Sequence, residues 1–470
     1  METQRPRLRR VLGQADLTFF LIAALVNLNS VPVVSGAGAA ALVLWIGGFA
    51  LFFIPQGIAV LELSSRYPQE GGVYRWTQTA FGDFHGFLSG WCYWTNNIFY
   101  VPTLLFYIVG FAAYIGGGAT AGLGDDPLVM VSVSLVLLWA LTALNIRGLA
   151  VSKWVETVGA VGTFATTLII LGIGLVALSS STMATPFTGS PFGGLFGDWG
   201  AAGLLSVVCL NYVGLELGPV LGDEIKDPRR TIPRAVLLAG FSTVVLYILA
   251  SFSLQATLPA DEIGVIEGIL QAVDRAAAAN QLGWVLAPIA VLMTLNAAGN
   301  TSAWLTGAAR IPFVIGIDRY LPAAFGNLHR RYNTPHVALI VQGVASSAII
   351  VVSSIGSTVS DMYMILLQTT VVLQLIPYLY IFGALIRIRR RHQAFEPERA
   401  YFRSAGPNYV AGALGFCVTA GALAFAFVPV KAVEDVWNFE SKLIAGTLSF
   451  LLPAVVIYFA RSRQARPPVG

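Results

Sequence analysis

Charged side chains are scarce in this sequence. Asp, Glu, Lys and Arg make up 11% of the 470 residues, whereas hydrophobic residues make up 56% and the mean hydropathy is +0.73. Soluble domains usually carry roughly 25% charged residues, so a water-soluble fold would lack the polar surface to cover this much apolar area. The composition predicts a membrane protein.

Histidine and cysteine are also few, which narrows the chemistry. The three cysteines lie in apolar segments, as expected for free thiols rather than a disulfide framework: Cys92, Cys209 and Cys417. The four histidines fall in predicted loops or at span ends, where they indicate neither a metal site nor a catalytic triad: His85, His329, His336 and His392. We therefore expect no enzyme activity, no cofactor and no bound metal.

Long polar stretches are missing as well. The longest covers about 25 residues, which leaves no room for a soluble catalytic domain. The net charge is +4, but the basic residues stand at segment ends rather than among aromatics, so nucleic acid is not an expected partner. The first apolar segment is long and has no small-residue cleavage site, so we expect a spanning helix there rather than a signal peptide.

Apolar segments long enough to cross a bilayer, about 20 residues each, fill most of the chain. We predict an all-α polytopic membrane protein with twelve spans, at residues 17–36, 38–61, 86–116, 127–144, 153–178, 199–222, 235–256, 283–307, 336–355, 361–385, 408–430 and 443–460. With the N-terminus in the cytoplasm, 25 of the 28 Lys and Arg residues fall in cytoplasmic segments. This bias predicts cytoplasmic termini and insertion in the inner (plasma) membrane.

Some charged residues near the cytoplasmic side have simple structural interpretations. The basic loop RIRRRHQAFEPER is expected to be a solvated connector near anionic headgroups, with a regulatory docking site as the alternative. Glu62 and Glu156 lie near the cytoplasmic ends of their spans. Water, or Arg66 and Lys153, would satisfy these two acids, so we assign them structural roles.

Two predicted spans contain residues that break helices at corresponding places. The first span reads FFLIAALVNLNSVPVVSGAG, and the sixth reads LLSVVCLNYVGLELGPVLG. Proline removes a backbone donor, and glycine costs a helix about 1 kcal/mol, so both stretches unwind easily. Freed N–H groups suit a carboxylate and freed carbonyls suit an amine. The matched pair predicts a solute site at the middle of the membrane, although packing kinks are the alternative for either helix alone.

Glu216 lies within the second of these breaks. A carboxylate in a spanning segment costs several kcal/mol unless it is paired, hydrated or protonated, which makes it a functional candidate. It would hold a substrate amine, carry a coupling proton or close a gate. A structural role, in which it accepts hydrogen bonds from an unwound neighbour, is the alternative.

Four ordered segments resemble the amino acid–polyamine–organocation superfamily over nearly the whole chain. They are ELSSRYPQEGGVYRWTQTAFGDFHGFLSGW, NIRGLAVSKW, NYVGLELGPVLGDEIKDPRRTIPRAV and GAARIPFVIGIDRYLPAAFGNLHRRYNTPHVAL. The third segment and QEGGVYRW are also similar to the polyamine uptake branch. The resemblance implies the leucine-transporter fold, with helices 1 and 6 unwound at the midplane.

That fold implies a division of the chain into parts. An N-terminal cytoplasmic tail at 1–16 would precede two inverted five-helix repeats, at 17–178 and 179–385. The remaining parts would be the basic loop at 386–407, two further helices at 408–460 and a C-terminal cytoplasmic tail at 461–470.

The resemblance also implies roles for individual residues. Where the family has a Gly-Ser-Gly motif that binds a substrate carboxylate, this chain has Asn29, Ser30 and Val31, so Asn27 and Asn29 are expected to contribute amide groups. Glu216 falls on an acid with a gating or proton-coupling role in some members. Further substrate contacts are expected at these positions of helices 3, 6 and 8: Asn97, Asn211, Tyr212, Gly214 and Trp304.

The coupling ion is left open by the same comparison. Thr163 stands where some proton-coupled relatives have a lysine and sodium-coupled ones bind sodium, so a lysine mechanism is not expected. Thr163, Thr301 and Ser302 would form an ion site if sodium is used. Protons acting through Glu216, sodium, or ungated exchange all remain, and we favour protons.

We therefore expect a secondary transporter of a neutral or cationic amino acid that works by alternating access, coupled to H⁺ or by exchange. A polyamine carrier and a Na⁺-coupled symporter are the alternatives, and a nutrient sensor that moves no solute is a remote one. The expected partners are the small-molecule substrate and the lipid bilayer. The sequence leaves a monomer and a homodimer equally open.

Overall fold

The computed structural model describes residues 10–67, 71–116, 120, 122–180, 183–185, 199–264, 268–279, 283–354, 359–392, 401–402, 404–428 and 436–461. These residues form helices joined by turns, and their one β contact is an isolated parallel bridge between Leu12 and Ile225. The all-α prediction is confirmed for this part of the chain.

In chain order, the helices begin with α1 (Gln14–Leu25), α2 (Val31–Ser35), α3 (Ala40–Gly48), α4 (Ile54–Arg66), α5 (Gly72–Phe81), α6 (Asp83–Ala113), α8 (Pro127–Ile146), α9 (Leu149–Ser180) and α11 (Trp199–Asn211). They continue with α12 (Leu217–Val220), α13 (Pro228–Thr257), α14 (Gly268–Ala279), α15 (Leu286–Ala308), α16 (Arg310–Ile317), α17 (His336–Ser353), α18 (Val359–His392), α19 (Gly406–Phe425) and α20 (Val436–Arg461). A 3₁₀ turn, η1 (Leu28–Ser30), precedes α2, and a π turn, η2 (Phe49–Phe53), joins α3 to α4.

Eleven helical segments within the described residues are long and apolar enough to cross a membrane, and each overlaps one predicted span. The remaining predicted span, 199–222, is divided between α11 and the four-residue α12. Neither piece reaches the 18 or so residues that a crossing needs. The multi-pass membrane fold is therefore clear, while the count of twelve and the inverted repeats stay predictions.

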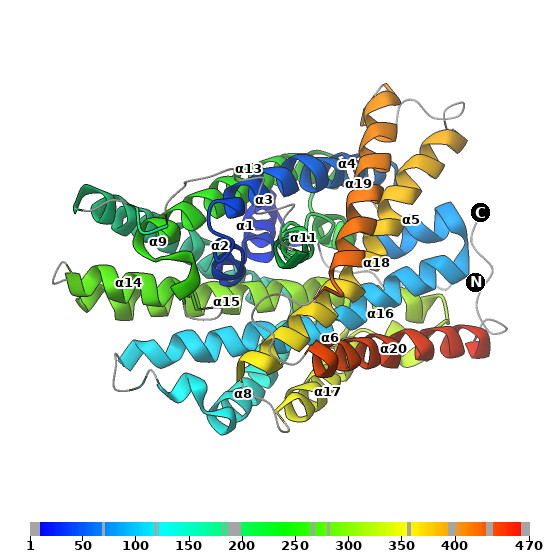
Figure 1. Ribbon diagram of the computed structural model, residues 1–470. Coiled ribbons are helices and arrows are strands. Elements are labelled where there is room, and N and C mark those ends of the chain that lie inside the picture. The colour runs from blue at the N-terminus through cyan, green and yellow to red at the C-terminus, as the bar shows by residue number, and fades with distance from the viewer. Residues whose placement is uncertain are drawn as a thin grey trace.

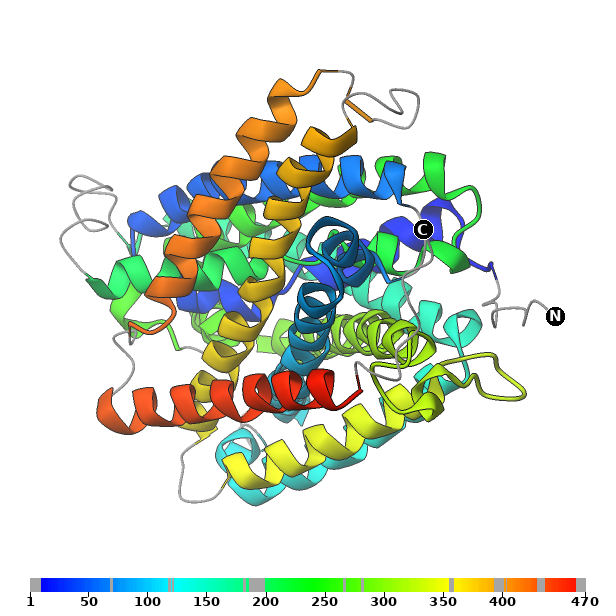
Figure 2. The ribbon, with the colours of Figure 1, turned by 90° about the vertical axis from the view of Figure 1, so that its right-hand side faces the viewer.

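The two unwound segments lie inside the bundle rather than at its rim. In Figure 1, α1 lies near the centre, with α14 at one end of the molecule and α5 at the other. α1 packs against α9, α13 and α15, whereas α2 packs against α11 and α13. At one edge of the bundle, α8 and α17 lie side by side (Figures 1 and 2).

One helix pair is held at backbone contact distance. A Cβ atom added to Gly159 of α9 would lie 2.7 Å from the Cα of Gly299 on α15, and one added to Gly299 would lie 2.8 Å from the Cα of Gly159. Small residues let helices approach this closely in membranes. The crossing fixes the register in which polar side chains of α9 meet those of α15.

Several helices continue beyond the predicted spans. α13 begins at Pro228 rather than near 235, and α18 runs on to His392 through four arginines. The predictions ended spans at charged residues, because charge marks the membrane surface. A helix does not have to end there, since its backbone hydrogen bonds are satisfied equally well in water.

Some predictions concern residues whose structure is not described. They include residues 1–9 of the predicted N-terminal tail, residues 393–400 and 403 of the basic loop, and residues 462–470 of the C-terminal tail. Cys92, Cys209 and Cys417 are free thiols, as predicted.

Candidate functional site

The first break follows directly after α1. The helix ends at Leu25, and the backbone is non-helical at Val26 (φ −84°, ψ 95°) and Asn27 (φ −104°, ψ 86°) before η1 begins. A helix that stops in this way leaves its last carbonyls without intrahelical partners. The predicted break in the first span is therefore present in the structure.

Side chains from α15 satisfy those carbonyls. Asn300 Nδ2 donates to the carbonyl of Ala23 at 2.7 Å and to that of Ala24 at 3.0 Å. Trp304 Nε1 donates to the carbonyl of Ala24 at 3.0 Å. Asn300 and Trp304 are four residues apart, so they lie on one face of α15. The end of α1 is thus bound by neutral amide and indole groups.

The second break separates α11 from α12 at residues 212–216. Gly214 adopts φ +128°, a conformation that residues with a Cβ rarely take. A Cβ at this position would also lie 3.2 Å from Leu25 Cδ2. The backbone therefore favours glycine here, and a side chain would also crowd Leu25 at the first break.

Glu216 folds back onto this break and is fully buried. Its carboxylate accepts hydrogen bonds from Tyr93 Oη at 2.9 Å, Gln56 Nε2 at 3.2 Å and the backbone N–H of Gly214 at 3.0 Å. The hydroxyl of Tyr378 also donates to it. None of the ion pairs found among the described residues involves Glu216. The acid joins α4, α6 and α18 to the second break through neutral donors.

One tyrosine connects the two breaks. The hydroxyl of Tyr247, on α13, accepts a hydrogen bond from the backbone N–H of Asn27 at 3.0 Å. The same hydroxyl lies within hydrogen-bond distance of two carbonyls that share its single proton, that of Leu25 at 2.7 Å and that of Asn211 at 3.0 Å. The two unwound segments therefore meet at Tyr247.

A face of α6 runs along both breaks. Tyr93 reaches Glu216, Tyr100 accepts a hydrogen bond from Asn27 Nδ2 at 2.9 Å, and Tyr107 donates to the carbonyl of Asn29 at 2.8 Å. Asn97 lies between Tyr93 and Tyr100 at helical spacing, on the same face. This face places Asn97 between two residues that contact the breaks, and its role in binding substrate stays a prediction.

Buried amide atoms without partners gather around these segments. The side-chain oxygens of Asn27, Asn97 and Asn211 and both amide atoms of Asn29 have no hydrogen-bond partner among the described residues. The oxygens of Asn97 and Asn211 are well assigned, because each Nδ2 donates to a carbonyl of its own helix. An unpaired buried polar atom costs about 1–3 kcal/mol, so these atoms call for a ligand or water.

The other predicted substrate contacts have partners within the protein. Tyr212 Oη donates to the carbonyl of Trp45 at 2.9 Å, and Ser30 hydrogen-bonds to Tyr363. Val31 is buried at the start of α2, and the Trp304 ring stands edge-on to Tyr100 with centroids 5.4 Å apart. All of them surround the breaks, but those with hydrogen-bonding groups use them to hold the breaks in shape.

The predicted ion-site residues hydrogen-bond to different residues of α9 and α15. The Thr163 hydroxyl donates to the carbonyl of Gly159 at 3.0 Å and accepts from Asn296. Thr301 donates to the carbonyl of Ala297 in its own helix, and Ser302 donates to Glu156. No contact found among the described residues joins Thr163 to Thr301 or Ser302, and the site stays a prediction.

At the end of the molecule near α5, acids are paired with cations. Arg310 Nη2 lies 2.9 Å from Glu224 Oε1, and both side chains are almost fully buried. Lys153 pairs with Asp16 at 3.0 Å. Arg66 Nε lies 2.8 Å from Glu62 Oε1, which also receives Arg389 at 3.1 Å. The structural role predicted for Glu62 agrees with this geometry.

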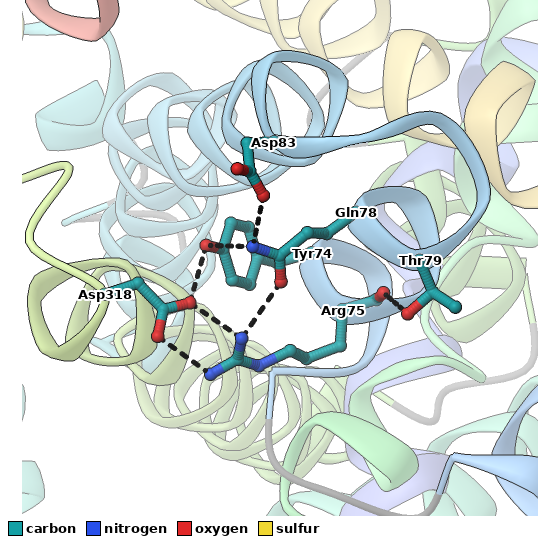
Figure 3. Close-up of polar contacts among 6 residues, drawn as sticks. All are labelled: Tyr74, Arg75, Gln78, Thr79, Asp83 and Asp318. Carbon is teal, nitrogen blue, oxygen red and sulfur yellow. Dashed lines mark hydrogen bonds and ion pairs between the residues drawn. The ribbon is translucent and has the colours of Figure 1, made fainter. Parts of the chain in front are cut away.

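Another ion pair attaches α5 to the segment after α16 (Figure 3). Arg75 binds Asp318 through two nitrogens, at 2.7 and 3.2 Å, and Tyr74 Oη donates to the same carboxylate at 2.7 Å. Gln78 links Tyr74 to Asp83. Burial and the Asp318 carboxylate raise the pKa of Tyr74 well above its usual value, so its hydroxyl remains a donor.

Of the two ways in which Glu156 was expected to be satisfied, water and Lys153, the structure excludes the second. Lys153 contacts Asp16 instead, and Glu156 accepts hydrogen bonds only from hydroxyl groups among the described residues.

Sequence reasoning missed the residues that hold the breaks in shape. Gln56, Tyr93, Tyr247, Asn300 and Tyr378 were not identified, although each is a polar residue in an apolar span. Asn296, Asn300 and Trp304 recur at every fourth position, which is a detectable signal for one helix face.

Comparisons with known proteins find one matching family model and several transporters as relatives. The sequence model of the amino acid permease family matches residues 12–450. An uncharacterized transporter of Legionella pneumophila is 27% identical over 94% of this chain and 95% of its own length. A probable agmatine/putrescine antiporter of Lactococcus lactis is 22% identical, covering 87% and 86% of the two chains. A glutamate/gamma-aminobutyrate antiporter of the same species is 23% identical, covering 88% and 82%.

Proposed function

Because this chain belongs to the amino acid permease family, and is therefore a membrane transporter rather than an enzyme, we propose that it exchanges a neutral or cationic amino acid across the membrane. The observation that carries the proposal is the group of unpartnered amides at the two breaks. Four of the unpartnered atoms are acceptor oxygens, on Asn27, Asn29, Asn97 and Asn211. An ammonium group has three N–H donors, so it suits such a set.

The same region offers a donor for a carboxylate. The Nδ2 atom of Asn29 is buried and unpartnered, and it follows the break where relatives have glycine. A solute with one amine and one carboxylate therefore uses both kinds of free group. This favours an amino acid over a polyamine, which would need several acids along its length.

Glu216 acts in this proposal as a gating or proton-coupling residue. Four donors already surround its carboxylate, so a substrate amine would have to displace one of them. Protonation would weaken its hold on α4, α6 and α18 together, because hydrogen bonds to a charged acceptor are the stronger ones. Proton movement would thus loosen contacts that alternating access has to break.

Exchange is favoured over one-way uptake by the relatives, since two of them bear the name antiporter. The agmatine/putrescine antiporter keeps amines without a carboxylate as the second candidate for the solute. We place the chain in the plasma membrane with its termini and α5 on the cytoplasmic side and α14 outside, as the distribution of Lys and Arg indicates.

The test is solute exchange in proteoliposomes loaded with unlabelled solute. A panel of radiolabelled amino acids and polyamines is offered outside, under separately imposed proton and sodium gradients. We expect exchange of at least one amino acid, faster with a proton gradient than with a sodium gradient. Failure to exchange or accumulate any panel member would overturn the proposal.

A matched pair of variants locates the site. Asn211→Ala removes an unpartnered amide at the second break, and Asn408→Ala removes a buried, unpartnered amide in the first turn of α19. We expect Asn211→Ala to lower affinity for the solute and Asn408→Ala to leave it unchanged. Equal effects would show that the unpartnered amides at the break are not the substrate site.

A further inference from the structure

Glu156 is a buried acid that the proposed exchange does not use. It is 1% exposed, and its Oε1 accepts hydrogen bonds from Ser302 at 3.2 Å and Thr306 at 3.5 Å. Its Oε2 has no partner among the described residues. A carboxylate in such a place is held by hydroxyl groups alone, which is poor compensation for a full negative charge.

The nearest cation is shared with a second acid. Arg310 is 1% exposed and binds Glu224 Oε1 through Nε and Nη2, each at 2.9 Å, while its Nη1 donates to the carbonyl of Thr306. The hydroxyl of the same Thr306 lies 3.5 Å from Glu156 Oε1 and also contacts Asn145, and Arg310 acts electrostatically on Glu156. Two carboxyl groups and one guanidinium therefore share a buried region. With both acids ionised the region would carry a net charge of −1, and one bound proton would neutralise it.

Glu224 also holds the segment that precedes α1. Its backbone carbonyl accepts from the N–H groups of Val11 at 2.9 Å and Leu12 at 3.1 Å, and the N–H of Lys226 donates to the carbonyl of Leu12 at 2.9 Å. We call Glu224, Arg310 and this bridge the cytoplasmic latch. The latch connects three parts of the chain: the segment before α1, the segment after α12 and the start of α16.

We propose that Glu156 is a proton-binding site that controls the cytoplasmic latch by competing with Glu224 for Arg310. When Glu156 is protonated, Arg310 stays on Glu224 and the latch is closed. When the proton passes to cytoplasmic water, the Glu156 carboxylate attracts Arg310, Glu224 is released to solvent, and the latch opens. Loss of H⁺ leaves a negative charge on the Glu156 carboxylate, and this charge attracts the positively charged guanidinium of Arg310.

The surroundings of Glu156 support this competition. The Gly159–Gly299 crossing fixes α9 against α15 one turn away, so the Arg310 side chain is the part that can move. Lys153 is occupied by Asp16 of α1. The other charged residues on or next to the packed helices are exposed, as Arg147 and Arg234 are, or belong to α14, which contacts the far part of α9, as Asp274 and Arg275 do.

Hydrogen exchange measured by mass spectrometry on the full-length protein in detergent tests the latch without any solute. The amides to follow are those of Val11, Leu12 and Lys226, after correction for the intrinsic effect of pH on exchange. In the wild type we expect protection to fall at least about tenfold from mildly acidic to mildly alkaline pH, because local opening sets the rate.

Three variants make the test specific. Glu156→Gln imitates the protonated acid, so in this variant the backbone amides of Val11, Leu12 and Lys226 should stay protected at every pH. In Glu224→Gln the same amides should lose protection at every pH. Glu156→Asp keeps the charge and should restore the pH dependence. The control Glu262→Gln, in an exposed pair with Arg275, should behave like the wild type.

The outcomes separate this inference from the proposed function. The inference rests on the proposed function only for its link to transport. A pH dependence in Glu156→Gln equal to that of the wild type would show a merely structural acid and overturn the inference. A pH-dependent latch in a wild type that exchanges no solute would leave the inference standing and refute the proposed function. If Glu156→Gln fails to fold, the inference is still overturned when hydrogen exchange of the latch amides shows no pH dependence in the wild type or in Glu156→Asp.

Discussion

The two breaks and the ion pairs near α5 satisfy buried polar groups in opposite ways. At the breaks, freed carbonyls and Glu216 are bound by tyrosine, asparagine, glutamine and tryptophan side chains, none of which carries a charge. Around Glu62, Asp16, Asp318 and Glu224, each acid meets an arginine or lysine within 3.0 Å.

This difference fits two different roles. The groups at the breaks have to exchange hydrogen-bond partners during transport, whereas the ion pairs have to keep helices together. Neutral hydrogen bonds have small net free energies, about 0.5–1.5 kcal/mol, so a solute or water replaces them at little cost. A buried ion pair that loses one partner leaves an uncompensated charge, which costs about 3–5 kcal/mol. The four substitutions below test this contrast, beginning with the largest expected effect.

Arg310→Ala should be the most damaging change to stability. It leaves the Glu224 carboxylate buried without a cation, and we expect the free energy of unfolding to fall by about 3–5 kcal/mol. The measurement is thermal or denaturant unfolding in detergent. The double variant Arg310→Met with Glu224→Gln should recover most of the loss. If the single and double variants are equally unstable, the pair is not what the substitution disturbs.

Glu216→Gln should act on exchange more than on stability. The amide keeps the size of the side chain but presents an NH₂ group to donors that need an acceptor. We expect solute exchange to fall at least about tenfold, equivalent to about 1.4 kcal/mol, and its pH dependence to flatten. Unchanged affinity and unchanged pH dependence would remove Glu216 from the site, while Glu262→Gln is the control that should change neither.

Tyr247→Phe should have an intermediate effect. It removes the hydroxyl shared by both breaks and leaves the N–H of Asn27 unpaired, which should cost about 1–2 kcal/mol of stability. Tyr212→Phe is the comparison, because within the described residues its hydroxyl hydrogen-bonds only to the carbonyl of Trp45. Unfolding midpoints of the two variants decide the matter, and a larger loss in Tyr212→Phe would contradict the bridging role.

Arg75→Gln should be the mildest of the four. The Arg75–Asp318 pair is partly exposed, with side-chain accessibilities of 21% and 14%, so water and salt screen it. We expect a loss of at most about 1 kcal/mol, shrinking as salt is added. Unfolding curves at low and high salt check this, and a salt-independent loss as large as that of Arg310→Ala would erase the distinction between the pairs.

The sequence predicted the helical segments well, because a bilayer demands long apolar runs and tolerates few charges. It also located both breaks, since Pro32 and Gly214 act on the backbone of their own helix. The partners of the breaks depend instead on which faces of distant helices meet. Nothing near Asn300 in the sequence indicates that it binds Ala23, and nothing near Lys153 indicates that Asp16 takes it from Glu156.

The π turn η2 places Gln56 opposite Glu216 by carrying one residue more than an α-helical turn would. Deleting a single residue within Phe49–Phe53 would restore a regular helix and rotate α4 by about 100° against α3. Gln56 would then face another neighbour. A deletion of this kind would therefore leave Glu216 to be held by a different set of donors.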